Sequence, residues 1–111
     1  MNAMDLEELR AELDRLNRDI LKTLNLRAGV VRQVRRLKEK QAHELFAPSR
    51  EKEMLDRLAA ENTGPFSDDT IRHLFKEIFR ASLDLMAQER AQSLLVSRGG
   101  QRPDVVINVK G

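Results

Sequence analysis

One uninterrupted helical pattern in the first third of the chain constrains the fold more than any other feature. No proline precedes Pro48, and Gly29 is the only glycine in this stretch. The pattern predicts a single helix over residues 5–41, which at ~1.5 Å per residue is roughly 55 Å long. The apolar residues that recur with helical spacing are Leu6, Leu9, Leu13, Leu16, Ile20, Val30, Val34 and Leu37.

A helix of this length cannot cover its own apolar face. The chain has 111 residues, and a compact domain of that size has a radius of gyration near ~13 Å. The apolar stripe therefore needs a partner, and a symmetric homodimer is the commonest solution. We expect an all-α fold in which the long helix is shared within an intertwined homodimeric bundle.

The middle of the chain predicts two further helices. Residues 41–47 lack the helical pattern and predict a loop, after which Pro48 suits the first turn of a helix that reaches about Asn62. Ser67 is an N-cap candidate for the third helix, which we expect to end near Gln92. These three helices define a predicted domain over residues 1–92.

From Ser97 onward the composition of the sequence changes. Residues 98–103 contain two glycines and a proline and predict a linker, whereas residues 104–110 predict a short β-strand. Such a strand has nothing to pair with in a three-helix domain. We therefore expect residues 93–111 to form a linker that leads towards a further domain.

Composition excludes several classes of protein. The chain has no cysteine and only two histidines, His43 and His73, so it predicts neither a disulfide framework nor a zinc site. No apolar run approaches the ~20 residues of a membrane span. The polar, acidic start is unlike a signal peptide. We expect a cytoplasmic protein without a metal or membrane contact.

Charged residues occupy positions where the long helix should be apolar. Written as heptads, Leu6, Leu13 and Ile20 lead to Arg27 on the same seam. Lys38 follows eleven residues later, which returns it to nearly the same face about 16 Å further along. On the third helix, Ser82 lies on the buried stripe. Cations that point into a helical core need an anionic partner.

Each of these positions also has a structural interpretation. Arg27 can extend its charge to solvent or pair with a glutamate, Lys38 belongs to a solvated basic run, and Ser82 can be a small residue at a helix crossing. A further hypothesis is a nucleic-acid-binding module, because residues 27–40 hold six Lys or Arg against one Glu. Two observations oppose it. Two of those cations lie on the apolar stripe, and no aromatic residues interleave for base stacking.

The spacing of these residues across the helices resembles that of the all-helical chorismate mutases. The resemblance covers about residues 4–92 and includes the pair Arg50–Glu51 at the start of the second helix. It also includes Ile71-Arg72-His73-Leu74-Phe75 in the third helix, where the family has an Ile-x-x-Leu-Phe signature. The resemblance implies an isomerase that converts chorismate to prephenate without a cofactor, as a homodimer with shared active sites.

A narrower resemblance concerns the C-terminal half. Gly64-Pro65-Phe66, residues 73–79 and Leu94-Leu95-Val96-Ser97-Arg98 are similar to mutase domains fused ahead of a DAHP synthase, the first shikimate-pathway enzyme. Residues 105–111 are similar to the linker that enters that synthase. The resemblance implies a bifunctional protein, and it leaves open a regulatory domain that binds prephenate or chorismate to control the synthase.

Roles follow from the resemblance position by position. It implies that Arg10 reaches a substrate carboxylate from the partner subunit, whereas Arg27 holds a carboxylate from its own subunit. Lys38 is implied to bind the ether oxygen and a carboxylate. Arg10 and Arg27 are seventeen residues apart, hence about 100° apart around one helix, so they converge more readily from two chains than from one.

The remaining implied roles belong to the shorter helices. Arg50 supports the site, Glu51 binds a substrate hydroxyl, and Ser82 lies near a carboxylate. Two positions depart from the family pattern, because Ala47 stands where many relatives have Asp and Met86 where they commonly have Gln or Glu. A missing donor to developing charge typically costs ~10²–10³ in rate. The sequence therefore predicts a slow mutase or a mainly regulatory pocket.

Overall fold

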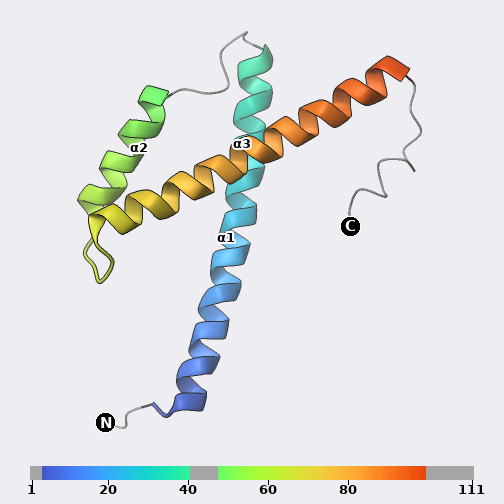
Figure 1. Ribbon diagram of the computed structural model, residues 1–111. Coiled ribbons are helices and arrows are strands. Elements are labelled where there is room, and N and C mark those ends of the chain that lie inside the picture. The colour runs from blue at the N-terminus through green and yellow to red at the C-terminus, as the bar shows by residue number, and fades with distance from the viewer. Residues whose placement is uncertain (1–3, 41–47, 100–111) are drawn as a thin grey trace.

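The computed structural model describes residues 4–40 and 48–99, and it contains three α-helices within these ranges (Figure 1). Helix α1 spans Leu6–Lys40, α2 spans Pro48–Glu61 and α3 spans Asp68–Gly99. The prediction of an all-α fold with one very long helix is confirmed for this part of the chain. The predicted loop over 41–47, which includes Ala47, and the predicted strand over 104–110 lie outside the described residues.

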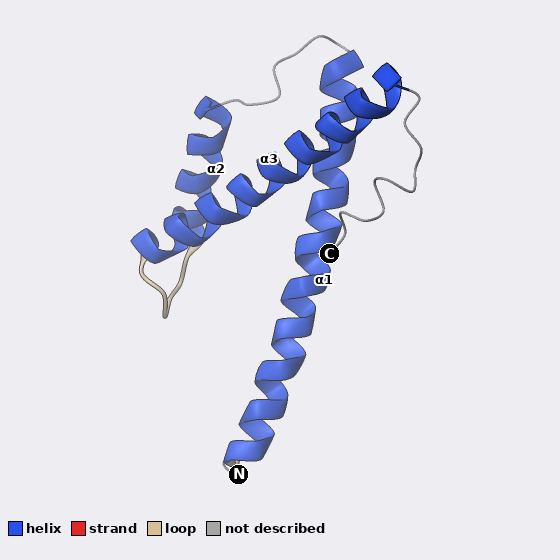
Figure 2. Cartoon of the chain, turned by 45° about the vertical axis from the view of Figure 1, so that its right-hand side comes forward, coloured by secondary structure: helices blue, strands red, loops and turns tan. Residues whose placement is uncertain are grey.

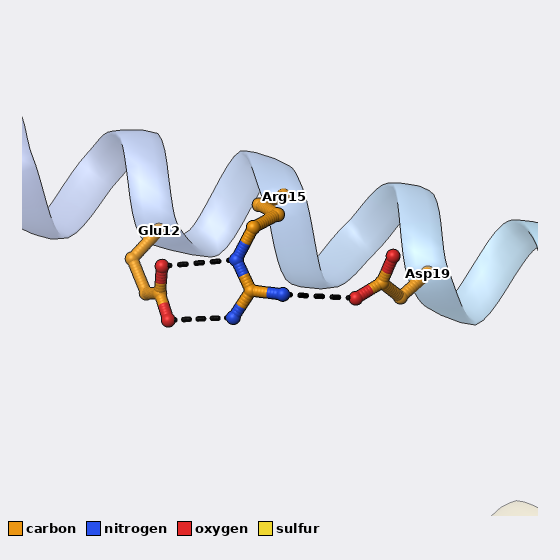
Figure 3. A network of polar contacts seen from close by, with 3 residues as sticks. All are labelled: Glu12, Arg15 and Asp19. Atoms are coloured by element: carbon orange, nitrogen blue, oxygen red, sulfur yellow. Dashed lines mark hydrogen bonds and ion pairs between the residues drawn. The ribbon is translucent and has the colours of Figure 1, made fainter.

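Helix α1 begins with a reciprocal cap. The Asp5 carboxylate accepts a hydrogen bond from the Glu8 amide at 2.8 Å, and the Glu8 carboxylate accepts one from the Asp5 amide at 3.0 Å. Further along, Arg15 donates two hydrogen bonds to Glu12 and one to Asp19 (Figure 3). These exposed pairs contribute little stability individually.

Hydrogen bonds of the Asn62 side chain stabilise the turn that connects α2 to α3. The side-chain amide of Asn62 donates to the Phe66 carbonyl at 2.7 Å, and its side-chain oxygen accepts from the Gly64 amide at 3.1 Å. Gly64 has a φ of 84°, in the left-handed region that favours glycine. Ser67 then caps α3 as predicted, because its hydroxyl accepts from the Thr70 amide at 3.1 Å.

The core of the single chain is small and lies around α2 and α3. Its buried side chains are Leu55 and Ala59 on α2 with Phe79 and Met86 on α3. In Figures 1 and 2, α2 and α3 diverge from their connecting turn, and α3 crosses the C-terminal half of α1. The site described below lies between these three helices.

The N-terminal half of α1 extends away from the other two helices in both views (Figures 1 and 2). No residue of α1 is buried. Along its apolar stripe, Leu13 is 59% exposed and Ile20 is 56% exposed. The radius of gyration is 19.0 Å, well above the ~13 Å of a compact domain of this length. The single chain therefore leaves most of its longest apolar surface uncovered.

The prediction that the third helix ends near Gln92 is wrong, because α3 continues to Gly99. No glycine or proline interrupts residues 93–98, so the helical hydrogen bonds can propagate to the Gly99-Gly100 pair. The predicted domain boundary at residue 92 thus falls inside α3. None of the helices described is sufficiently long and apolar to cross a membrane.

Candidate active site

A pocket of about 400 Å³ lies where the three helices meet. This volume is in the range of small-molecule sites. Helix α1 contributes most of the charged lining residues, α2 contributes residues of its first two turns, and α3 contributes mainly apolar side chains. The lining residues are Arg27, Val31, Val34, Arg35, Lys38, Arg50, Glu51, Met54, Phe79, Ser82, Leu83 and Met86.

Arg27 is the side chain that connects α1 to α3 in this pocket. Its Nη1 donates to the Ser82 hydroxyl at 2.9 Å, and that hydroxyl donates to the Ile78 carbonyl at 3.1 Å. Its guanidinium carbon lies 5.0 Å from the centroid of the Phe79 ring. The ring face partly compensates a cation that has lost water. Arg27 is thus fixed in place with several of its five donors still unused.

Desolvation also acts on the charge of Arg27. Burial lowers the pKa of its guanidinium below the ordinary value for arginine. Arginine still remains protonated at neutral pH. A partly desolvated and permanently positive group gains most from an anion, and bidentate carboxylate binding matches its geometry.

The pocket carries an excess of positive charge. Four of its lining residues are cationic, namely Arg27, Arg35, Lys38 and Arg50, and Glu51 is the one lining anion in the part of the chain that the structure describes. Arg50 donates to Glu53 at 2.6 Å and is half exposed. Glu51 alone does not balance the three other lining cations. This arrangement suits a small ligand with more than one negative charge.

Six of the seven predicted site residues line the pocket, and their individual roles stay predictions. Arg10 does not line it. It precedes Arg27 by seventeen residues, which is about 25 Å along α1. Met86, 8% exposed, places an apolar side chain in the pocket wall one turn after Ser82.

Sequence reasoning missed several lining residues, of which Arg35 is the only charged one in the described pocket. In the sequence it belongs to the same basic run as Lys38, which is typical of a solvated face. The signal that identifies it is spacing, since Arg27, Val31, Arg35 and Lys38 follow one another at intervals of four, four and three residues. Within the described ranges, no group of His, Asp and Glu side chains is arranged to hold a metal ion.

Comparison with known proteins agrees with this geometry. The sequence matches the family described as chorismate mutase type II over residues 9–87. The chain belongs to the type II chorismate mutase family. The match includes every lining residue of the pocket and Arg10, so the predicted membership in a family of isomerases is confirmed.

Two solved structures share the chorismate mutase fold of this chain. A chorismate mutase from Thermus thermophilus in its form II is 52% identical, with a TM-score of 0.71, and the match covers 72% of this chain and 91% of that one. Form I of the Thermus protein is 51% identical, with a TM-score of 0.69 and coverage of 69% and 96%.

Two curated relatives are longer proteins. A bifunctional chorismate mutase/prephenate dehydratase from Aquifex aeolicus is 33% identical over 85 residues, which is 73% of this chain. The T-protein of Haemophilus influenzae is 35% identical over 79 residues, which is 69% of this chain. The matched region spans 24% and 21% of these two relatives.

Proposed function

We propose that this domain rearranges chorismate to prephenate. The observation that carries the proposal is the Arg27 guanidinium, which is partly desolvated and contacts Ser82 and Phe79 in a cationic pocket. Family membership and the identity to the Thermus chorismate mutase support the same activity. The substrate is a small dianion, and the excess of cations in the pocket supports its binding.

The chemistry of this rearrangement matches the residues available. The reaction is intramolecular and proceeds without a nucleophile or a proton relay, so an enzyme accelerates it by holding a reactive conformer. It also stabilises the negative charge that develops on the ether oxygen as the bond breaks. Arginine is suited to gripping a carboxylate, and the compact ammonium of lysine is suited to a single oxygen.

Individual roles follow the family pattern. In the proposed complex, Arg27 holds one carboxylate and Lys38 donates to the ether oxygen and to a carboxylate. Glu51 accepts from a substrate hydroxyl, Arg50 supports the site, and Ser82 lies near a carboxylate. The position of all five along the pocket wall is consistent with this assignment.

The proposed site is completed by a second subunit. Arg10 is too far along α1 to reach the pocket of its own chain, and the apolar stripe around it is exposed in the single chain. A homodimer that covers this stripe can bring Arg10 of one subunit to a substrate carboxylate in the other. The proposed enzyme is therefore a homodimer with shared active sites.

Met86 favours a second candidate function. Its thioether adds an apolar surface where relatives commonly carry a donor, so the pocket can bind the dianion better than it accelerates the reaction. The second candidate is a regulatory domain that binds prephenate or chorismate.

For either role we propose a DAHP synthase as the neighbouring domain. The proposal rests on the motifs of residues 64–66 and 94–98, whereas the name of the Aquifex relative gives a prephenate dehydratase instead.

The decisive experiment is a spectroscopic assay of chorismate loss and prephenate formation by the purified chain, with Arg27→Ala as the test variant. We expect turnover that falls by at least about 10²-fold in Arg27→Ala, because a charge-stabilising donor is lost. Arg36→Ala is the matched control, since Arg36 is exposed and nine residues further along, on the opposite side of α1.

Three outcomes separate the candidates. Turnover lost in Arg27→Ala alone supports the mutase. Binding of prephenate by calorimetry without turnover favours the regulatory candidate. Absence of both binding and turnover, or full activity in Arg27→Ala, contradicts the proposed site.

A further inference from the structure

Arg35 lines the pocket but has no part in the family pattern described above. Its side chain is only 14% exposed, which is low for an arginine near the end of a surface helix. It lies eight residues after Arg27 and three before Lys38, so it projects from the pocket side of α1 between these two cations. A largely covered cation in this place needs an explanation.

The polar contacts of Arg35 are weak for a guanidinium that is only 14% exposed. Its Nη1 lies 3.4 Å from the Glu89 carboxylate, and its Nε lies 4.0 Å from the carboxylate of Glu39, beyond hydrogen-bonding distance. That Nε is inaccessible to solvent and has no hydrogen-bond partner among the residues described. Desolvated donors of a charged group are costly when they stay unpaired. Among the residues that the structure describes, most of the hydrogen-bonding capacity of Arg35 is therefore unused.

Glu89 contacts two arginines, Arg32 and Arg35, and lies closer to Arg32. Its carboxylate lies 2.5 Å from the nearest guanidinium nitrogen of Arg32, against 3.4 Å for Arg35. Arg32 is 43% exposed and does not line the pocket. Because one carboxylate serves two cations, and Glu39 is half exposed and screened by solvent, the charge of Arg35 is only partly compensated.

Glu89 also lies at the position on α3 from which it can hold Arg35 against the pocket. It follows Met86 by three residues and Ser82 by seven, so all three lie on one face of α3. Arg35 and Met86 both line the pocket. Arg35 therefore brings donors to a lining in which Met86 offers none.

We propose that Arg35 is a further ligand-binding residue of this pocket, that its guanidinium donates to an anionic oxygen of the bound dianion, and that Glu89 is the positioning residue that orients it. This inference rests on the proposed binding of chorismate or prephenate. It assigns to α1 a third cation, beside Arg27 and Lys38, that contacts the ligand. The arginine fork can donate to a ligand carboxylate while it keeps its contact with Glu89.

The test compares Arg35→Met with Arg32→Met. Both substitutions remove a guanidinium that contacts Glu89, but only Arg35 lines the pocket. The readouts are kcat and KM for chorismate, the Kd of prephenate by calorimetry, and the midpoint of thermal unfolding. We expect Arg35→Met to weaken prephenate binding and raise KM by about tenfold to a hundredfold, as for a lost charged hydrogen bond. Arg32→Met should stay within about twofold in both.

Two further variants test the roles of the planar Arg35 guanidinium and of Glu89. Arg35→Lys keeps the charge and should recover part of the affinity but not all, because the planar fork is lost. Glu89→Gln should raise KM by less than Arg35→Met does, and the double variant should be no worse than Arg35→Met alone, since the two residues act as a unit. Circular dichroism checks that each variant is folded.

A merely structural ion pair gives a different result. In that case Arg35→Met and Arg32→Met lower the unfolding midpoint alike while KM and the prephenate Kd stay unchanged, and the assignment of Arg35 is wrong. Additive effects of Arg35→Met and Glu89→Gln on KM contradict the positioning role. If the unmodified chain neither binds prephenate nor consumes chorismate, the proposed function itself fails and this inference fails with it.

Discussion

Arg27 is a residue whose position is unfavourable for folding and to which the proposed function gives a binding role. It occupies an aliphatic seam of α1, and burial lowers the pKa of its guanidinium. The Phe79 ring and the Ser82 hydroxyl compensate part of the lost hydration. A cation–π contact contributes roughly 0.5–2 kcal/mol, less than the cost of removing a charge from water. In the proposed complex, an anionic ligand compensates this partial loss of hydration further.

Met86 offers a test of the same pocket at a neighbouring position. We predict that Met86→Gln raises kcat for chorismate, by up to about 10²-fold, because an amide donor can stabilise charge that develops in the transition state. The expected gain is in kcat, with a smaller change in KM. Steady-state kinetics on both proteins measures it.

Met54→Gln is the matched control for this substitution. Met54 also lines the pocket, but from α2, so the control introduces the same amide at a different part of the wall. We expect no increase in kcat there. A neutral or harmful Met86→Gln, or an equal gain in both variants, contradicts the view that a donor is missing at residue 86.

At the scale of helices, α2 and α3 are joined by a polar contact beside their apolar core. Arg72 on α3 donates to Asp56 on α2 at 2.7 Å, and Lys52 donates to the second oxygen of the Asp56 carboxylate at 2.8 Å. The hydrogen bond from Lys52 and then that from Arg72 hold the pKa of Asp56 below its ordinary value. The charged form of Asp56 is therefore favoured in the folded chain.

This depressed pKa predicts how stability depends on pH. A carboxyl with a lower pKa in the folded state contributes stability above its unfolded pKa of 3.8 and loses it as the pH falls through the folded value. We predict that Asp56→Asn lowers the urea midpoint at pH 7 and flattens its decline below about pH 4. The size is small, because the group is exposed to solvent.

Urea unfolding followed by circular dichroism at several pH values measures this effect. Asp69→Asn is the matched control, since Asp69 is exposed and lies in the first turn of α3, with no ion pair to α2 within the described residues. Parallel pH profiles for Asp56→Asn and the unmodified chain would show that the contact with Arg72 does not couple to folding.

At the scale of the whole molecule, the long helix α1 leaves its apolar stripe exposed in the single chain. Leu6, Leu9, Leu13, Leu16 and Ile20 are each 41–60% exposed. Complete burial of such a side chain contributes about 1.5–3 kcal/mol, so pairing two copies of this stripe gives a large driving force for association. The same pairing is what the proposed site needs in order to receive Arg10.

Subunit mixing tests the homodimer and the contribution of Arg10 across its interface in one experiment. We predict that Arg10→Ala and Arg27→Ala are each inactive as homodimers, whereas a mixture refolded at equal concentrations recovers about a quarter of the activity. Half of the dimers formed are then mixed, and each holds one intact site if Arg10 acts across the interface. The assay of chorismate loss on the refolded mixture measures the recovery.

A mixture of Arg27→Ala with Lys38→Ala is the control, because both residues line the pocket of one chain and every site in the mixed dimer stays defective. Absence of recovery in the first mixture, or recovery in both, contradicts a site shared through Arg10. A monomer by analytical ultracentrifugation contradicts the homodimer as well.

Most of the helical architecture could be predicted from local signals. Ser67 caps α3 where the sequence indicates, and Pro48 begins α2. The predicted end of α3 lies seven residues too early, since the sequence contains no helix breaker before Gly99 and its composition changes only from Ser97. Helix propagation depends on the hydrogen bonds of the preceding turn, so the helix continues through residues of mixed polarity.

The sequence by itself determined the long helix, its apolar stripe and the anomaly of Arg27 and Lys38 upon it, because all three follow from a fixed helical period. Only the tertiary structure decided which α3 residues face those cations, with Ser82 bonded to Arg27 and Met86 in the wall. The crossing of α1 and α3 is set by side-chain packing between distant segments, which no local period encodes. For the same reason the sequence presents Arg35 as one more solvated charge, whereas in the structure its side chain is only 14% exposed and lines the pocket.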